Sequence, residues 1–478
     1  MKDFARAAVD RAASCGASYA DCRVIERLSQ DIVAKNGELE RMATGRNYGW
    51  GVRVIVDGGW GFASTFRFDP PSLESTVKKA CEIARATASL RKRPVRLAPA
   101  PVVQAAWTAP IVKDPFQVDD GIKASTAIEA SKAMMQPKVR AASAMMNFLK
   151  ETKTLATSEG SLVEQVIYES SASIQAFATD GKEVQRRTYP NSIFGDVRTE
   201  GYEHIERVDI AGAAPRIASE AVELLSAPQC PAGTTTIILD PTQLALQLHE
   251  SGGHPMELDR VLNHEADFAG TSFLGLDKLG TFRYGSDQVN ITADATLPGG
   301  RGTFAYDDDG VAAQRTELVN HGILVGYMSS RETAGELGWL SSGANRGDGW
   351  GRIPIVRMTN VSLEPGEWTL EDLIADTDDG LYLYTNKSWS IDDRRLNFQF
   401  GTEVGYVIKN GKIVGKVKNP VYTGITYQFW GGCDAVCDRR DWHVYGFPCG
   451  KATPGQNGHV GHGTSHARFR NVVVGVKA

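Results

Sequence analysis

The sequence predicts an α+β protein of two domains, an amino-terminal antiparallel sheet with helices and a β-rich carboxy-terminal domain. Its 478 residues, 42% of them hydrophobic, exceed what one ordinary core accommodates. Turn pairs divide alternating segments in the first half, as in antiparallel hairpins. The pattern changes at residues 226–233, where two prolines and a glycine separate apolar elements. We therefore predict domains at residues 1–227 and 228–478.

The first domain begins with a helical pattern at residues 2–15 and continues with strand-like alternation. The Asn36-Gly37 and Asp57-Gly58 pairs are hairpin signals within this alternation. The alternating segments are residues 22–27, 30–35, 38–43 and 51–65.

Helices and further strands complete the first domain. Leu73, Val77 and Ala84 recur at helical spacing and predict a helix at residues 71–90. Residues 98–114 are rich in proline and alanine without periodicity, which predicts an extended crossing segment. The remaining predicted elements are a helix at 119–136, strands up to about 208 and a helix at 210–225.

The second domain opens with an apolar strand at residues 234–240 and a helix at 242–250. Short alternating strands follow, which makes this domain β-rich. Residues 341–353 and 431–448 are polar and glycine-rich, so we expect surface loops there. The turn pairs between the strands are Pro298-Gly299, Asp309-Gly310, His321-Gly322, Pro365-Gly366 and Asn410-Gly411.

Charge and cysteine content restrict the function. The formal charge of −5 is spread without long like-charge runs, which argues against nucleic acid and against a polybasic membrane patch. The amino terminus lacks an apolar signal region, and no run has transmembrane length, so we expect a cytoplasmic protein. Seven scattered cysteines do not suggest a secreted disulfide framework, but one of them can serve as a thiolate ligand.

Residues 248–255 read L-HESGGH-P and form the strongest chemical motif. Two imidazoles, His249 and His254, with the adjacent carboxylate of Glu250 can hold a zinc ion and deprotonate water. The alternative is structural, because a His-Glu pair can complement a helix dipole and Gly-Gly-His-Pro can be an ordinary helix end.

The five-residue spacing of the histidines tests the zinc interpretation. Four residues along an α-helix leave two side chains about 40° apart, whereas five leave them about 140° apart. Paired glycines end helices readily, and Pro255 disfavours a helical His254. We therefore predict a helix with a broken last turn, in which His254 lies past the helix end and folds back towards His249.

Several ordered segments resemble the TldD/PmbA family of metallopeptidases over most of the chain. The resemblance implies a zinc peptidase in which two motif histidines and a late cysteine hold the metal, whereas the PmbA-type partner lacks the motif. Because this chain has the motif, it resembles the active, TldD-type subunit. The matching stretches are GASYADCRV, GWGVRVIVDGGWGFAST, HESGGHPMELDR followed by DFAGTSF, YDDDGVAAQRTELVNHGILVGYM and CGKATPGQNGHVGHGT.

The resemblance assigns a role to each motif residue. It implies that His249 and His254 bind one zinc ion, that Glu250 is the general base and that Cys449 is the third ligand. Two neutral imidazoles and one thiolate leave a fourth tetrahedral position for water. A thiolate donates more charge than a third imidazole, which makes Glu250 correspondingly more important.

Other residues compete for the ligand positions. Cys433 and Cys437, spaced C-x3-C, are rival thiolates, and His264 is a rival third imidazole. Glu257 and Asp259 can accept hydrogen bonds from a ligating imidazole, although a solvated turn is an equal alternative.

The remaining polar clusters have simpler interpretations. His459, His462 and His466 lie close together in sequence, near Cys449, and can line a substrate site. Residues 307–309, three consecutive aspartates, lack the alternating oxygen ligands of a calcium loop, so we predict a hairpin turn.

These observations together predict a zinc-dependent endopeptidase that hydrolyses peptides or unfolded protein segments. The resemblance further implies an enclosed assembly, either a heterodimer with a PmbA-like subunit or a homodimer. Two alternatives stay open. The chain can be a non-catalytic partner or scaffold that keeps metal for stability, or a metal-dependent amidase that acts on small molecules.

Overall fold

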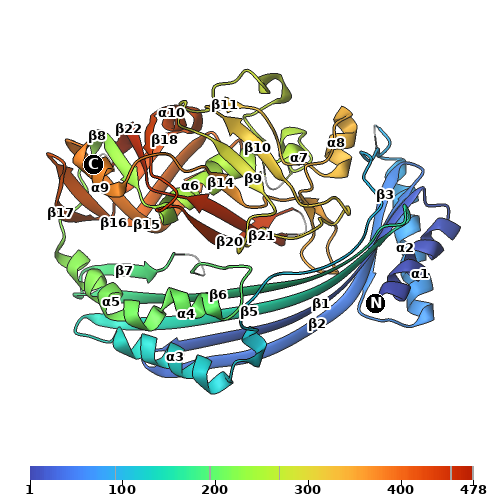
Figure 1. Cartoon of the computed structure of the whole chain (residues 1–478), viewed down its shortest axis with the longest axis horizontal. Helices are drawn as coiled ribbons and strands as arrows, with labels where there is room; N and C mark the ends of the chain where they lie inside the picture. The colour runs from blue at the N-terminus through green and yellow to red at the C-terminus, as the bar shows by residue number, and fades with distance from the viewer. Residues whose placement is uncertain (92, 193–194, 268–269, 453–454, 476–478) are drawn as a thin grey trace.

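The two halves of the chain each form a large sheet. The computed structural model describes residues 1–91, 93–192, 195–267, 270–452 and 455–475. Figure 1 shows a long curved sheet from the amino-terminal half, blue to green, beneath the carboxy-terminal half, yellow to red. The antiparallel first sheet with its helices and the β-rich second half confirm the predicted α+β class.

The amino-terminal sheet has the strand order β3-β2-β1-β5-β6-β4, and β7 also pairs with β6. The described pairs are antiparallel, except that β4 runs parallel to β6. The strands are β1 (Tyr19–Lys35), β2 (Glu38–Val56), β3 (Gly59–Thr65), β4 (Gln104–Thr108), β5 (Val139–Thr157), β6 (Leu162–Thr179) and β7 (Val184–Tyr189).

The structure adds to two predictions about this sheet. The predicted segments 22–27 and 30–35 form one strand, because β1 pairs with β2 on one side and β5 on the other throughout this stretch. The predicted crossing at 98–114 contains β4, whose backbone gains partners in β6. These pairings join strands that are distant in the sequence, so the local alternation of polar and apolar residues does not predict them.

Helices cover the side of this sheet that faces away from the carboxy-terminal half, with α1, α2 and α3 clearly placed there (Figure 1). The side chains of Asp69 and Asp119 cap α2 and α3 by accepting backbone N–H bonds. Alternate strand residues such as Trp50 and Met146 are fully buried beneath these helices. The helices are α1 (Lys2–Ser14), α2 (Pro70–Ala88), η1 (Pro115–Gln117), α3 (Asp120–Ala133), α4 (Glu203–Val208) and α5 (Ile210–Ser226).

The main sheet of the carboxy-terminal half closes on itself. Its order is β15-β8-β22-β18-β16-β17, and β15 also pairs with β16. A large apolar core lies against this ring and includes Trp430 and Phe469. The strands are β8 (Gly233–Leu239), β15 (Asp379–Ile391), β16 (Asn397–Lys409), β17 (Lys412–Lys418), β18 (Val421–Ile425), β19 (Cys433–Val436) on β22, and β22 (Ala467–Val474).

Smaller sheets and helices complete this half. β11-β10-β9-β14 form one sheet, β12 and β13 pair, and β20 and β21 form a long hairpin. The elements are α6 (Pro241–Leu248), η2 (His249–Gly253), η3 (His254–Met256), α7 (Leu258–Val261), η4 (Leu276–Lys278), β9 (Ile291–Asp294), β10 (Arg315–Asn320), β11 (Ile323–Leu324), α8 (Arg331–Leu337), β12 (Asn345–Arg346), β13 (Ile355–Val356), β14 (Val361–Leu363), α9 (Leu370–Ala375), α10 (Thr426–Gly431), β20 (His443–Lys451) and β21 (Gln456–Thr464).

The expected surface loop at 431–448 is wrong in part. Cys433 and Val436 lie on β19 and are buried in the core, where β19 pairs with β22. The polar and glycine-rich composition misled the prediction, because pairing with a buried strand brings the few apolar residues inward.

The turn at residues 307–309 is the predicted hairpin turn. Tyr306 and Ala312 form an antiparallel bridge across it, and Gly310 takes the left-handed conformation at φ 77°. The turn is also a docking element, since its aspartates are buried against the amino-terminal sheet.

Buried ion pairs join this turn to the sheet. Asp308 accepts hydrogen bonds from Arg23 at 3.0 Å and Lys153 at 2.6 Å, and Asp309 accepts one from Arg53 at 2.6 Å. Burial alone would raise the pKa of Asp308, but Lys153 and Arg23 hold it below its ordinary value. The two halves are therefore held together by charges without access to water.

We expect Asp308→Asn to lower the free energy of unfolding by about 3–5 kcal/mol, because it leaves two buried cations without their carboxylate. Urea unfolding measures the effect. Asp287→Asn is the control, since Asp287 pairs with Arg283 on the surface and its loss costs about 0.5 kcal/mol or less. Equal midpoints for the two variants would contradict the docking role.

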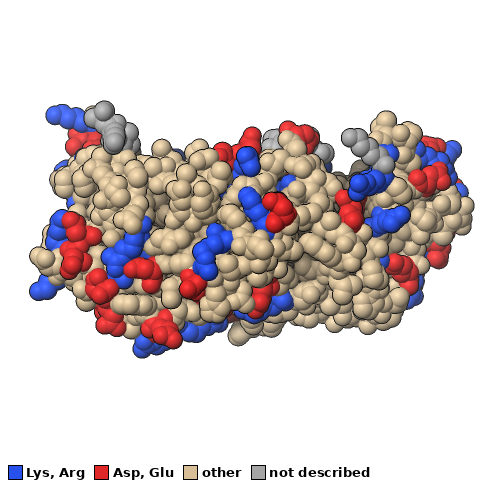
Figure 2. All heavy atoms as spheres, turned by 90° about the horizontal axis from the view of Figure 1, so that it is seen from above, with Lys and Arg blue, Asp and Glu red and all other residues tan. Residues whose placement is uncertain are grey.

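Charged residues of both signs are interspersed on the face seen in Figure 2. Within the described ranges, every helix is too short or too polar to cross a membrane.

Candidate metal centre

The motif lies at the end of α6, which enters the core directly after β8. The Asp240 side chain accepts hydrogen bonds from the backbone N–H groups of Thr242 and Gln243, and Pro241 occupies the first turn, where no N–H partner is needed. Every residue of α6 is buried. The helix thus delivers the motif into the protein interior.

The helix does not stop at His249 but widens into the single π turn η2. The backbone N–H of His254 donates to the carbonyl of His249, five residues earlier. A π turn joins residues i and i+5, so it returns the second histidine to the face of the first. The two ring centroids lie 4.7 Å apart. This turn accommodates the five-residue spacing.

The predicted break at the glycine pair is wrong, whereas the predicted return of His254 towards His249 is confirmed. Gly253 has φ −74°, and His254 is right-handed helical at φ −57° and ψ −42° although Pro255 follows it. Packing explains the glycine, because a Cβ on Gly253 would lie 2.0 Å from Met358 Sδ. The buried, continuous helical path overrides the usual preference of a residue before proline.

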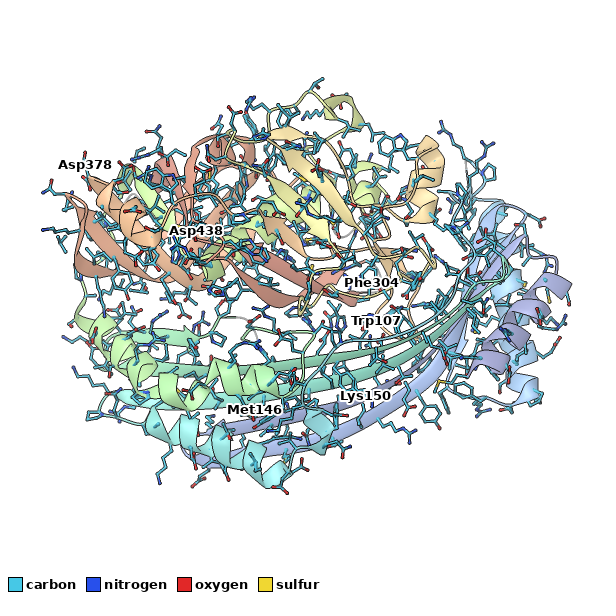
Figure 3. The ribbon with its side chains drawn as sticks, viewed as in Figure 1. Trp107, Met146, Lys150, Phe304, Asp378 and Asp438 are labelled. Atoms are coloured by element: carbon cyan, nitrogen blue, oxygen red, sulfur yellow. The ribbon has the colours of Figure 1, made fainter. Side chains whose placement is uncertain are left out.

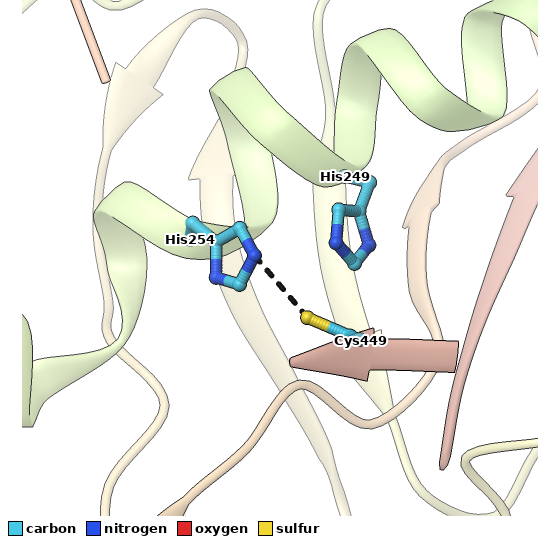
Figure 4. A group of neighbouring side chains, drawn as sticks. All are labelled: His249, His254 and Cys449. Carbon is cyan, nitrogen blue, oxygen red and sulfur yellow. Dashed lines mark hydrogen bonds between the residues drawn. The ribbon is translucent and has the colours of Figure 1, made fainter. Parts of the chain in front are cut away.

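His249, His254 and Cys449 meet in one cluster, with one donor atom from each within 4.8 Å of the others. Within the described ranges, this is the one group of three or more His, Cys, Asp and Glu side chains so arranged. Cys449 comes from β20, and its Sγ lies 3.3 Å from His254 Nε2 (Figure 4). All three side chains are buried.

The pKa values of the three side chains in this cluster favour the protonation states that bind a metal ion. Burial lowers the pKa of both His249 and His254 to about 4, so both rings are neutral at pH 7. Burial raises the pKa of the Cys449 thiol, but His254 and Arg357 outweigh it and lower the value to about 7. Neutral imidazole and thiolate are the forms that bind metal.

Hydrogen bonds orient His254. Its Nδ1 lies 2.8 Å from the Glu257 carboxylate, which accepts the Nδ1–H and leaves the Nε2 lone pair towards Cys449. Arg260 donates to the same carboxylate oxygen at 2.8 Å, and Lys451 lies 3.3 Å from it. Glu257 thus contacts the imidazole as anticipated, whereas Asp259 forms an ion pair with Lys451 at 2.7 Å.

A second histidine orients His249. His462 Nδ1 donates to the Val361 carbonyl at 3.0 Å, so its Nε2 carries a lone pair. That Nε2 lies 2.8 Å from His249 Nδ1, which must therefore be the donor. His249 Nε2 is left with a free lone pair for a metal. The Val361–His462–His249 chain fixes the tautomer of the inner ring.

Glu250 is held by a residue that the sequence analysis did not identify. Arg395 Nη1 donates to Glu250 Oε2 at 2.7 Å. Arg395 lies in the turn between β15 and β16 at a left-handed φ of 62°, and its N–H bonds to the Asp392 carbonyl. Such a conformation is unusual for a long side chain and occurs often at functional sites.

The rival ligands lie elsewhere. Cys433 and Cys437 are outside the cluster, in and after β19, and burial raises the pKa of Cys433. His264 pairs with Glu336 at 3.3 Å and is partly exposed.

The late histidines divide into different roles. His462 contacts His249, whereas His459 bonds to Glu169 and His466 contacts Tyr382 at 2.9 Å. Only the proximity of His462 to the motif in three dimensions reveals its role, since 213 residues separate it from His249.

We expect His462→Leu to weaken metal affinity about 10–100-fold, because His249 loses the acceptor that sets its tautomer. Competition with a fluorescent zinc chelator measures this affinity. His466→Leu is the matched control, since His466 is also buried but contacts no cluster residue. Identical affinities in both variants would show that the tautomer does not depend on His462.

Comparisons with known sequences match this chain to metallopeptidases of one family. The PmbA/TldA metallopeptidase family models match as domain 1 at residues 20–84, as the central domain at 113–227 and as the C-terminal domain at 232–476. A metalloprotease of Methanothermobacter thermautotrophicus is 32% identical, over 96% of this chain and 95% of the relative. A zinc metalloprotease TldD homolog of Saccharolobus solfataricus is 23% identical over 98% of both chains.

The fold is also similar to that of solved structures. TldE from Thermococcus kodakarensis superposes with a TM-score of 0.71 at 16% identity, covering 99% of this chain and 100% of that chain. The matches to all three domain models, together with the relative that is 32% identical over nearly the whole length, identify the family. The chain belongs to the PmbA/TldD family of metallopeptidases, as a TldD-type member.

Proposed function

We propose that the chain is a zinc-dependent endopeptidase that hydrolyses peptides or unfolded protein segments, with His249, His254 and Cys449 as ligands and Glu250 as general base. The observation that carries the proposal is the meeting of three buried donor atoms from one helix end and one distant strand. The name of the Saccharolobus solfataricus relative, a zinc metalloprotease, supports the choice of metal.

The residues present fit zinc. Both imidazoles have Nδ1 occupied by hydrogen bonds, so each offers Nε2, and the thiol of Cys449 titrates near neutrality. Two nitrogens and one sulfur are a common donor set for catalytic zinc, which keeps one position for water or substrate. Soft thiolate disfavours magnesium and calcium.

The residues of the chain would then each have a separate role in the reaction. A bound zinc ion supplies a Lewis acid next to the scissile carbonyl. Glu250 takes a proton from the attacking water at its carboxylate and passes it to the leaving amine. Arg395 holds that carboxylate in place. Glu257 and His462 keep both imidazoles in the tautomer that offers Nε2.

We further propose that the substrate binds extended, in a cytoplasmic assembly that encloses the site, either a heterodimer with a PmbA-like subunit or a homodimer. Such a chamber would exclude folded proteins by size. In the described strands β20 pairs only with β21. On its other edge the Gly446 carbonyl accepts from Val197 and the Gly446 N–H donates to Asp196, and we propose that the remaining backbone groups of this edge bind an extended peptide.

Metal removal tests this function. We expect a chelator to abolish cleavage of an unstructured peptide and stoichiometric zinc to restore it, with a Tm that rises on zinc addition because zinc binds the native state. Elemental analysis and a fluorogenic peptide assay, run with and without a PmbA-like subunit, give the readouts. Stoichiometric zinc without peptide cleavage in either arrangement would favour a scaffold instead.

A further inference from the structure

A cavity separate from the metal cluster lies between the two halves. One wall comes from the inner face of the amino-terminal sheet, with Glu151 and Glu169, and the other from the carboxy-terminal half, with Arg301, Arg346 and Arg357. Its volume is about 40 Å³. Figure 3 shows Phe304, another lining residue, on the edge of the carboxy-terminal half that faces the long strands.

Cations outnumber carboxylates in the cavity lining. Five Lys and Arg side chains line it with two glutamates, and Asp308 and Asp348 pair with Lys153 and Arg27 from outside the lining. Arg27, Lys153 and Arg301 each have a carboxylate partner. Arg346 and Arg357 form no ion pair with any described carboxylate. Two cations in a shielded place therefore lack counter-charges, which is uncommon in proteins.

Arg357 is the most buried of these cations, with 1% of its surface exposed. Its Nη2 donates to the Cys449 carbonyl, whereas its Nε and Nη1 have no hydrogen-bond partner among the described residues. The guanidinium lies against Gly458, where a Cβ would be 2.2 Å from Nη2. A glycine is therefore required for this arginine to reach its position.

Arg346 is fixed in a similar way. It donates to the carbonyls of His459, at 2.8 Å, and Met358, and its guanidinium lies 5.1 Å from the centroid of the Phe304 ring. Its Nε has no partner among the described residues, and the same is true of Nη1 of Arg301. Burial, with a smaller contribution from the nearby Arg357, lowers the pKa of Arg346 to about 10.

From these unused donors we propose that the cavity is a binding site for an oxyanion, either the terminal carboxylate of a peptide or a phosphate group. Planar guanidinium groups match both ligands by paired, charge-assisted hydrogen bonds. The bond from Arg357 to the Cys449 carbonyl connects this site to the backbone of a candidate metal ligand. This proposal does not depend on the peptidase mechanism.

Isothermal titration calorimetry of the full-length protein tests the proposal with three probes at constant ionic strength. These are inorganic phosphate, an N-acetyl dipeptide with a free carboxylate, and the same dipeptide as its amide. We expect saturable binding of phosphate or of the carboxylate dipeptide, and none of the amide. Binding of phosphate alone identifies a phosphate site, and binding of the carboxylate alone identifies a peptide-end site.

Two variants and one control make the result specific. Arg346→Met should weaken binding at least about tenfold, because it removes a charge-assisted donor. Arg301→Lys should weaken it while keeping the ion pair with Glu169, and it serves alone if Arg346→Met does not fold. Arg283→Met, which changes an exposed arginine, should bind normally. The absence of saturable binding in the natural protein, or unchanged binding in Arg346→Met or Arg301→Lys, would overturn the proposal.

Discussion

Glu250→Gln is expected to lower kcat for peptide cleavage about 10²–10⁴-fold while the protein keeps its zinc. Glutamine has nearly the same shape as glutamate but cannot take a proton from water. The metal ligands are unchanged, so zinc content should stay at one equivalent. A loss of kcat with full metal occupancy would show that Glu250 acts as the base and is not a metal ligand.

Zinc content by elemental analysis and single-turnover cleavage of an unstructured peptide measure the two quantities. The substitution also removes the ion pair with Arg395, so Tm must be compared with that of the parent. Glu336→Gln is a suitable control, because Glu336 pairs with His264 away from the cluster. Cleavage by Glu250→Gln at the parent rate would exclude Glu250 as the base.

Cys449→Ala is expected to have the second largest effect, a loss of zinc affinity of at least about 100-fold with cleavage lost in parallel. The reasoning is that losing a ligand must cost more than the 10–100-fold typical of losing a residue that only orients one. Two imidazoles alone leave half of a tetrahedral site unfilled.

Zinc retained after dialysis against a weak chelator provides the measurement. Cys433→Ala and Cys437→Ala are matched controls, since both remove a buried thiol outside the cluster. If either of these variants loses zinc while Cys449→Ala keeps it, the assignment of the thiolate is wrong.

Much of the fold could be predicted because local patterns agree with the final structure. The predicted helices at 71–90, 119–136 and 210–225 correspond to α2, α3 and α5 within a few residues. Their apolar spacing and caps are local properties. The length of β1 and the pairing of β4 depend on distant partners, and so they could not be predicted from short windows.

The site residues that could be predicted are those that belong to a recognisable sequence motif. The motif predicted that His249 and His254 would come together, and resemblance to the family added Cys449. The π turn was missed because spacing arguments assume an α-helix, although the requirement that both rings share one face could have suggested it. His462 and Arg395 were missed because no local pattern links them to the motif.

The distance along the chain between the two parts of the metal cluster has a consequence for biosynthesis. Cys449 follows His254 by 195 residues and lies on the β20–β21 hairpin. A growing polypeptide on the ribosome therefore cannot offer the third donor until 195 further residues have followed His254, and contacts of such high sequence separation form late in folding. If the proposed zinc site is correct, zinc would be acquired late in maturation, and nascent chains that still lack Cys449 would not become active proteases.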